Sequence, residues 1–164
     1  MKDAKFADGA DSGKRSSPGS AMEVALAEAR AAARRGEVPV GAALLGADGV
    51  LIAAAGNRTR ELGDPSAHAE MLVIREACRQ RGSERLVGCD LYVTLEPCAM
   101  CAAVISFARI RRLYFGAADP KGGAVEHGPR LFSQPTCHHA PEVYGGMAES
   151  EAAQLLRAFF QERR

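Results

Sequence analysis

The chain has 164 residues, 47% of them apolar, and carries 21 Lys and Arg against 20 Asp and Glu, for a net charge of +1. This length and composition are those of a single globular domain with a sizeable core. The near-neutral balance excludes a protein that binds nucleic acid through overall charge, so any RNA affinity must come from a local patch. Apolar stretches in the sequence stay well below membrane-spanning length, so no association with a membrane is expected.

The N-terminal segment differs in character from the rest. Residues 1–20 are polar, rich in Gly, Ser, Asp and Lys, and lack the apolar run of a signal peptide. We expect residues 1–20 to be a disordered tail and residues 21–164 to form the domain. The five cysteines are odd in number, which favours a reducing cytoplasm over a disulfide framework.

Helices and strands are predicted to alternate along the domain. A capping box at Ser20 to Glu23 marks the first helix start, and Ala47-Asp48-Gly49 is a hairpin turn. In chain order we expect a helix to Gly36, strands at 38–45 and 50–55, a helix from about His68 to Arg81, a strand at 91–95, a helix from Cys98 to about Ala108, a strand at 112–115 and a helix at 148–163. This alternation predicts a three-layer α/β/α sandwich with a central mixed sheet.

Two short motifs carry the chemistry, His-Ala-Glu at residues 68–70 and Pro-Cys-Ala-Met-Cys at residues 97–101. His68, Cys98 and Cys101 supply three zinc ligands, and three protein ligands leave a fourth position for water, as in catalytic zinc sites. Cysteines three apart lie on one side of a helical turn, and a helix N-terminus favours thiolates. Glu70 is close enough in sequence to His68 to handle the protons of that water. The pattern predicts one catalytic Zn²⁺ per chain in a base deaminase.

The cysteine pair on its own has other interpretations. A Cys-x-x-Cys pair also occurs in redox motifs and in structural zinc sites. A structural site needs a fourth ligand, and the sequence near His68 offers Glu70 instead. The catalytic site is therefore preferred over a structural metal or a redox pair.

Longer stretches around these motifs resemble the bacterial tRNA wobble adenosine deaminases. The similar stretches are residues 37–42, 56–58, 64–70, 91–101 and 115–124, and the resemblance covers roughly residues 22–160. It implies a cytidine-deaminase-like fold, a homodimer, and conversion of adenosine to inosine at the first anticodon position of tRNA, in particular of an arginine tRNA. The tRNA anticodon stem-loop is then the expected partner. Residues 125–146 depart from the pattern of the enteric members of the family.

The resemblance also assigns roles to single residues. It implies zinc ligands at His68, Cys98 and Cys101, and a proton shuttle at Glu70. It further implies a contact of Asn57 with the flipped base, pocket walls at Val38 and Leu95, and a position of Asp119 beside the nucleotide that precedes the target.

Several candidate residues have plain structural interpretations. Asn57 and Asp119 both stand in sequences typical of turns. Cys137 is followed by two histidines, His138 and His139. This group suggests a second metal site, although adjacent histidines rarely converge on one ion. Phe159 and Phe160 are expected to pack in the core, and Arg109, Arg111 and Arg112 either contact phosphate or form a solvated face.

Two other functions remain open from the sequence. One is a deaminase of a free base or nucleoside, such as guanine or cytosine, which shares the two metal motifs. The loop at residues 115–122 argues against it, because that loop resembles the tRNA branch. The other is a non-catalytic zinc subunit that presents RNA to a partner, and the intact Glu70 argues against that function.

Overall fold

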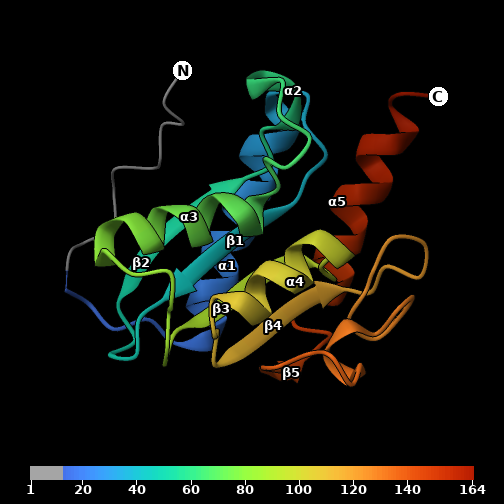
Figure 1. Ribbon diagram of the computed structural model, residues 1–164. Coiled ribbons are helices and arrows are strands. Elements are labelled where there is room, and N and C mark those ends of the chain that lie inside the picture. The colour runs from blue at the N-terminus through green and yellow to red at the C-terminus, as the bar shows by residue number, and fades with distance from the viewer. Residues whose placement is uncertain (1–12) are drawn as a thin grey trace.

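The computed structural model describes residues 13–164, and residues 1–12 of the predicted tail lie outside the described part (Figure 1). Helix α1 (Pro18–Arg34) begins earlier than predicted, so the expected domain boundary at residue 20 falls inside it. The predicted capping box at Ser20 is wrong, since Ser17 is the N-cap and its Oγ accepts the N–H of Ser20 at 3.2 Å. Pro18 explains the shift, because a proline fits the first position of a helix, where its missing N–H costs nothing.

A five-stranded mixed sheet forms the centre of the molecule, with strand order β2-β1-β3-β4-β5. β1 pairs antiparallel with β2 and β3, whereas β3, β4 and β5 run parallel to one another. The strands are β1 (Gly41–Leu45), β2 (Leu51–Gly56), β3 (Asp90–Leu95), β4 (Arg112–Ala117) and β5 (Glu142–Tyr144). The predicted first strand from Val38 is therefore shorter, because residues 38–40 precede the paired segment.

Helices cover both faces of this sheet (Figure 1). Helices α1 and α5 (Glu149–Gln161) pack on one face, and α3 (Ala69–Arg81) and α4 (Ala99–Phe107) pack on the other. The predicted three-layer α/β/α sandwich is confirmed. None of the helices within residues 13–164 is both long and apolar enough to cross a membrane.

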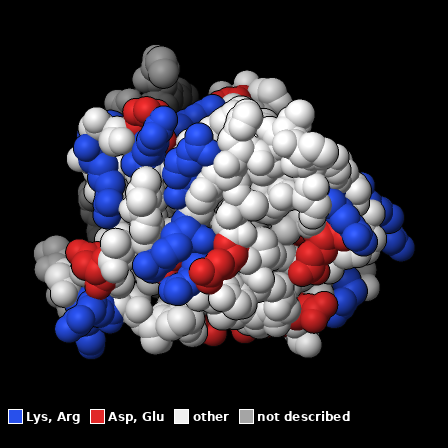
Figure 2. Space-filling view, turned by 60° about the horizontal axis from the view of Figure 1, so that its bottom comes forward, with Lys and Arg blue, Asp and Glu red and all other residues white. Residues whose placement is uncertain are grey.

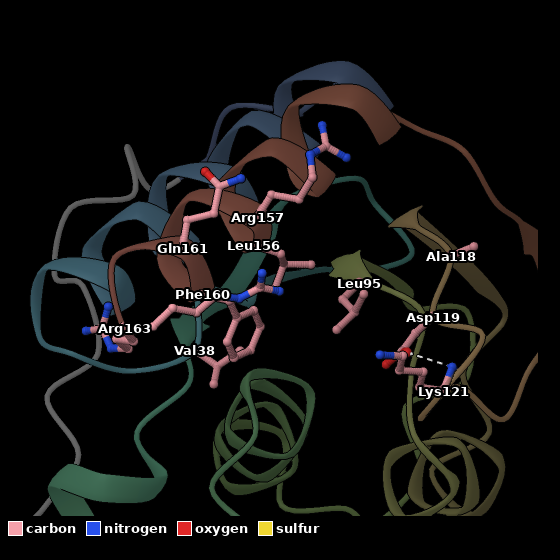
Figure 3. A pocket seen from close by; sticks show the side chains of 11 residues that line it. Val38, Leu95, Ala118, Asp119, Lys121, Leu156, Arg157, Phe160, Gln161 and Arg163 are labelled. Atoms are coloured by element: carbon pink, nitrogen blue, oxygen red, sulfur yellow. Dashed lines mark hydrogen bonds between the residues drawn. The ribbon is translucent and has the colours of Figure 1, made fainter.

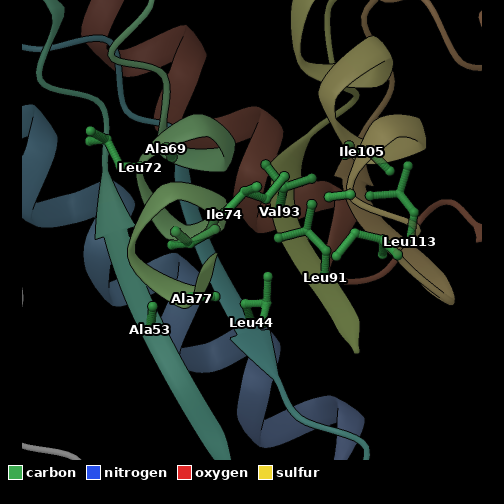
Figure 4. Close-up of a cluster of buried hydrophobic side chains, with 14 of the residues drawn as sticks. Leu44, Ala53, Ala69, Leu72, Ile74, Ala77, Leu91, Val93, Ile105 and Leu113 are labelled. Atoms are coloured by element: carbon green, nitrogen blue, oxygen red, sulfur yellow. The ribbon is translucent and has the colours of Figure 1, made fainter. Parts of the chain in front are cut away.

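The larger part of the core lies between the sheet and helices α3 and α4. Figure 4 shows Leu44 and Val93 of the sheet against Ile74 of α3, and Ile105 of α4 against Leu113. β3 is buried on both faces, as its apolar sequence predicts. Because this core fixes α3 and α4 on the sheet, it also fixes their N-terminal ends, where the two metal motifs lie.

Helix α1 packs on the other face with its backbone almost touching the sheet. A Cβ atom at Gly41 would lie 1.9 Å from the carbonyl oxygen of Ala25, and one at Gly56 would lie 2.5 Å from that of Glu28. The contact face of α1 is built from small residues, including the fully buried Ala25 and Ala29. Glycine at these two strand positions is what allows so close an approach.

Three short elements were absent from the prediction, and one of them is a 3₁₀ helix at Leu131–Ser133. Helix α2 (Thr59–Leu62) follows β2, and β5 adds three residues to the sheet edge in a segment rich in Gly, Pro and His. Tyr144 of β5 stacks on Tyr114, and Tyr114 stacks on Tyr92, with ring centroids 5.0 and 4.5 Å apart. These contacts between strands hold β5, and the local sequence gives no sign of them.

The C-terminal helix corrects one prediction about the core. Phe159 is buried, as expected, but Phe160 is 50% exposed. The two side chains leave the helix about 100° apart, so adjacent residues face different surroundings. Phe160 therefore belongs to the surface of a groove that lies beside the metal motifs.

Candidate metal centre and substrate cavity

Three ligand atoms meet at the N-terminal ends of α3 and α4. His68 Nδ1 lies 3.7 Å from Cys98 Sγ and 3.6 Å from Cys101 Sγ, and the three atoms all lie within 4.8 Å of one another. A tetrahedral zinc ion with usual Zn–S and Zn–N bonds requires N···S separations of about 3.6 Å. Among residues 13–164, no other group of His, Cys, Asp and Glu has this arrangement.

The local backbone explains this convergence. His68 is the N-cap of α3 and Cys98 is the N-cap of α4, each with an extended backbone, and Cys101 follows one helical turn later. The hydrogen bonds that Cys98 Sγ accepts, chiefly from Cys101 and then from His68, lower the pKa of Cys98 to about 4, so this sulfur is a thiolate at neutral pH. A thiolate is the form of cysteine that binds a metal ion.

Glu70 lies in the first turn of α3 and points into the protein rather than to solvent. The residue is 3% exposed, and its Oε2 atom has no hydrogen-bond partner among the described residues. Burial raises the pKa of this carboxyl group to about 7. A buried carboxylate oxygen without a partner is costly, which indicates that a polar or charged group belongs beside it. The ligand triangle and this oxygen together fit a zinc ion that carries a water molecule.

A cavity of about 240 Å³ opens over the three ligands. Seven of the eight residues that the sequence singled out line it, and the eighth is Cys101, whose Sγ lies 3.6 Å from His68 Nδ1. The lining residues are Val38, Val40, Asn57, Thr59, His68, Glu70, Leu95, Glu96, Cys98, Asp119 and Gly122. The structure therefore brings all the candidate residues together from five separate segments.

Asn57 has both a structural and a site-facing role. Its Oδ1 accepts the backbone N–H of Ala69 at 2.9 Å, which satisfies one of the free amides at the start of α3. This bond fixes the orientation of the side-chain amide, whose NH₂ group is left as a donor for the cavity. Asn57 thus joins the end of β2 to the helix that carries His68 and Glu70.

A larger groove of about 840 Å³ continues from this cavity (Figure 3). Val38, Leu95 and Asp119 line both spaces, so the two are contiguous. On the far side of the groove, α5 contributes apolar and basic side chains, and Figure 3 shows Phe160 near Val38 and Arg157 higher on the same helix. The groove therefore combines an exposed aromatic ring with cations: Lys121, Arg157, Arg163 and Arg164.

Asp119 lies in the loop that separates the cavity from this groove. Its Oδ1 accepts the backbone N–H groups of Lys121 and Gly122 at 3.1 and 2.9 Å, which is a local turn. The expected turn role is therefore present in the structure, and the second carboxylate oxygen is not used by these two bonds. Asp119 also lines the cavity and the groove, so the two interpretations are compatible.

Sequence reasoning missed four lining residues: Val40, Thr59, Glu96 and Gly122. Glu96 had a detectable signal, because a carboxylate directly after a buried strand must find partners for its oxygens. Burial alone would raise the pKa of Glu96, but hydrogen bonds from the Asp119 amide, the His127 ring and the Glu126 amide keep it below its usual range.

The other candidates have structural contacts instead. Cys137 Sγ donates to the carbonyl oxygen of His139 at 3.1 Å, and the ring of His139 bonds to the carbonyl oxygen of Ile110 at 2.6 Å, so these residues do not converge on a second metal. Arg111 pairs with Asp90 at 2.8 Å, and Arg112 pairs with Glu142 at 3.0 Å. The contacts of these two arginines support the solvated-face interpretation.

Comparison with known proteins gives consistent results. The family model of the cytidine and deoxycytidylate deaminase zinc-binding region matches residues 16–117. A tRNA-specific adenosine deaminase of Agrobacterium fabrum is 70% identical over 143 residues, which cover 87% of this chain and 93% of that protein. A solved structure of a tRNA:A34 deaminase, which edits A to I at the wobble position, superimposes with a TM-score of 0.81 at 70% identity and covers 83% of this chain and 98% of that one.

A more distant relative has a different substrate. The guanine deaminase of Bacillus subtilis superimposes with a TM-score of 0.61 at 29% identity, and the match covers 79% of this chain and 85% of that chain. The architecture is thus shared by enzymes that act on tRNA and by enzymes that act on a free base.

Proposed function

The chain belongs to the cytidine and deoxycytidylate deaminase family, in its branch of tRNA-specific adenosine deaminases, and we propose on this basis that it converts adenosine to inosine at the wobble position of tRNA. The observation that carries this proposal is the buried Glu70 carboxylate, whose Oε2 has no hydrogen-bond partner among the described residues, in one cavity with His68 and Cys98. The proposed natural substrate is the anticodon stem-loop of an arginine tRNA.

His68, Cys98 and Cys101 are the proposed ligands of one zinc ion per chain. When bound, zinc supplies a water molecule whose pKa is lowered to about 7, so that it is a nucleophile at neutral pH. Glu70 accepts a proton from the attacking water and passes it to N1 of adenine. It then takes the proton of the new C6 hydroxyl group and delivers it to the amino group, which leaves as ammonia while the C6 carbonyl of inosine forms. A raised pKa suits this carboxyl group, because it must both accept and donate a proton near neutrality.

The remaining lining residues are proposed to hold the flipped base. Val38 and Leu95 form apolar walls, and the NH₂ group of Asn57 donates to a ring nitrogen of the purine. Bases of an anticodon loop are already free of pairing, so extrusion of adenosine into the cavity costs little. Asp119 and the groove beyond it would then face the nucleotide that precedes the target.

A deaminase of free bases is the alternative, and the groove argues against it. A free base needs one closed cavity, whereas this cavity opens into a space several times its volume that is lined by cations and by Phe160. Those are the features of a single-stranded nucleic-acid site, where bases stack on aromatic rings and phosphates meet positive charge. The 70% identity to a tRNA-specific enzyme supports the same choice.

The experiment compares four substrates with one enzyme preparation. Purified protein is incubated with an anticodon stem-loop that carries adenosine at the wobble position, and separately with free guanine, cytosine and adenosine, and products are quantified by mass spectrometry. Inosine in the stem-loop alone is the expected result. Turnover of a free base alone would establish the alternative, and the absence of any turnover with a full complement of zinc would indicate a non-catalytic subunit.

We also propose that the protein acts as a homodimer in the cytoplasm. Helix α4 and residues 131–141 contain no Lys, Arg, Asp or Glu, and Phe107 at the end of α4 is 71% exposed. Figure 2 shows a broad uncharged area with the charged side chains around it. An exposed apolar ring in an uncharged surface is typical of an interface. Sedimentation should therefore give a dimer mass that Phe107→Glu reduces to the monomer, while the exposed Val87→Glu serves as the control.

A further inference from the structure

Glu96 is a buried carboxylate with an unusual number of partners. It directly follows β3, is 2% exposed, and lies two residues before the Cys98 ligand. Its Oε1 accepts the backbone N–H groups of Glu126 at 2.7 Å and His127 at 2.9 Å, with that of Val125 at 3.3 Å. Its Oε2 accepts the N–H of Asp119 at 2.8 Å and lies 2.8 Å from His127 Nδ1.

These bonds organise a segment that has no regular structure of its own. Residues 118–130 contain no helix or strand, so their backbone amides need partners elsewhere. Glu96 provides one centre around which both ends of the segment 119–127 fold. Gly123 lies directly against it, since a Cβ atom there would be 2.5 Å from the Glu96 carboxyl carbon.

We propose that Glu96 is a positioning residue of the deaminase, whose carboxylate fixes segment 119–127 so that Asp119 and Gly122 form one wall of the substrate cavity. The proposal rests on the proposed function for its readout in deamination. The carboxylate acts through the backbone of the segment and not on the reacting atoms. Glu96 also lies outside the His-Cys-Cys group of possible metal ligands.

A second buried carboxylate, Glu37, offers a matched case, because it bonds to Thr59 of the cavity lining. Glu37 is 1% exposed, and its carboxylate accepts the backbone N–H groups of Arg60 at 3.0 Å and Glu61 at 2.8 Å, and the hydroxyl of Thr59 at 3.1 Å. It thus secures the start of α2 as Glu96 secures segment 119–127. Glu37→Gln is therefore the control for Glu96→Gln. It also removes a buried charge that bonds to backbone amides, but it has no direct effect on Asp119.

Glu96→Gln is a selective variant. Its amide oxygen can still accept from Glu126 and His127, and the His127 ring can accept from the new NH₂ group by a change of tautomer. The NH₂ group would however face the N–H of Asp119, and two donors cannot bond. The substitution therefore releases mainly the end of the segment that carries Asp119.

The first readout is independent of activity. Hydrogen–deuterium exchange of the zinc-loaded protein should show faster exchange across residues 118–128 in Glu96→Gln than in the wild type. Glu37→Gln should instead show faster exchange across residues 58–63. Unchanged protection of residues 118–128 in Glu96→Gln would overturn the proposal, whatever the activity of the variant.

The second readout is kinetic, with the anticodon stem-loop as substrate. KM should rise by about tenfold in Glu96→Gln, the effect of one unsatisfied hydrogen bond, while kcat changes by less than about threefold because Glu70 and the metal ligands are intact. The double variant Glu96→Gln/Asp119→Asn should raise KM by less than the product of the two single effects. For Glu37→Gln combined with Asp119→Asn, the rise in KM should equal that product. Multiplicative behaviour of the Glu96 pair, or a loss confined to kcat, would contradict positioning through Asp119.

A second variant changes the contact between Glu96 and segment 119–127 on the side of the segment, at Gly123. Gly123→Ala keeps the Glu96 charge but directs a methyl group at its carboxyl, so segment 119–127 must shift and KM should again rise. If Glu96→Gln does not fold, a normal KM and normal exchange in Gly123→Ala would sink the proposal. Wild-type protein without activity on the stem-loop would refute the proposed function instead, and the exchange experiment would still decide the role of Glu96.

Discussion

The cavity and the groove that continues from it form one site, whose inner and outer walls are built in different ways. The inner wall holds His68, Glu70, Cys98 and Cys101, which come from two motifs at the N-termini of helices that the core fixes on the sheet. The outer wall comes from segment 119–127 and the exposed face of α5, which lie far apart in sequence and meet only in the fold. Under the proposed function the difference separates two tasks, with the chemistry assigned to the inner wall and RNA binding assigned to the outer wall. Changes to the inner wall should therefore alter kcat, and changes to the outer wall should alter KM.

The largest effect is expected from loss of a metal ligand. Cys101→Ala should lose the zinc ion, abolish deamination and lower the melting temperature, because ligand binding is coupled to folding. Zinc per chain from elemental analysis, together with the melting temperature, checks this. Wild-type protein should contain about one ion per chain, since there is one site. Full metal content in the variant would remove Cys101 from the inner wall.

Glu70→Ala tests the chemistry of the inner wall without loss of the metal. Zinc should remain, and kcat should fall by at least about 10²-fold, the scale of general acid–base catalysis. The melting temperature should fall far less than in Cys101→Ala, because the zinc ion and its three ligands remain in place. Near-normal turnover by the folded, zinc-loaded variant would refute the assigned proton shuttle.

Adjacent phenylalanines allow a matched test of the outer wall. Phe160→Ala should raise KM for the stem-loop by about five- to 150-fold, the range for loss of one base that stacks on an aromatic ring. Phe159→Leu, at the buried position, should lower the melting temperature and leave KM near the wild-type value. If Phe160→Ala instead lowers kcat with no change in KM, the assignment of RNA binding to the outer wall is wrong.

The smallest effect is expected at Asp119. A carboxylate oxygen beside the preceding nucleotide can accept a hydrogen bond from a 2′-hydroxyl, which DNA lacks. Asp119→Asn keeps the Oδ1 acceptor of the local turn, and it should reduce the preference for RNA by roughly 1–2 kcal/mol. The ratio of rates on an RNA stem-loop and on its deoxy analogue, at one salt concentration, measures this. An unchanged ratio would leave Asp119 with its turn role alone.

The inner wall was accessible from sequence because its signals are local. A histidine before a helix and two cysteines one turn apart define their own geometry once the helix starts are known, and both helices begin at the expected ligands. The alternation of apolar strands and amphipathic helices likewise predicted the three layers. Placement of Asn57 and Asp119 in the same cavity came from the family resemblance and not from their local sequence, which is that of turns.

The outer wall was less predictable because its contacts are long-range. Helical spacing gave Phe159 and Phe160 the same expected role, yet only the buried one fills the core. Segment 119–127 depends on a carboxylate about 30 residues earlier in the sequence, at Glu96. β5 depends on a tyrosine stack across three strands. In each case the decisive partner is distant in sequence, and periodicity contains no information about it.

Helix α1 packs closely on Gly41 and Gly56, on the face of the sheet that lies behind the substrate cavity. β1 begins at Gly41, and Val38 and Val40, which line the cavity, come immediately before it. The backbone of α1 is in direct contact with Gly41, so the position of these two cavity residues is coupled to the packing of a helix on the opposite face of the sheet. For directed evolution of substrate range, substitutions at the small residues Ala25 and Ala29 would therefore shift β1 and the cavity residues that precede it. Such substitutions lie remote from the base and leave every group in contact with the substrate unchanged.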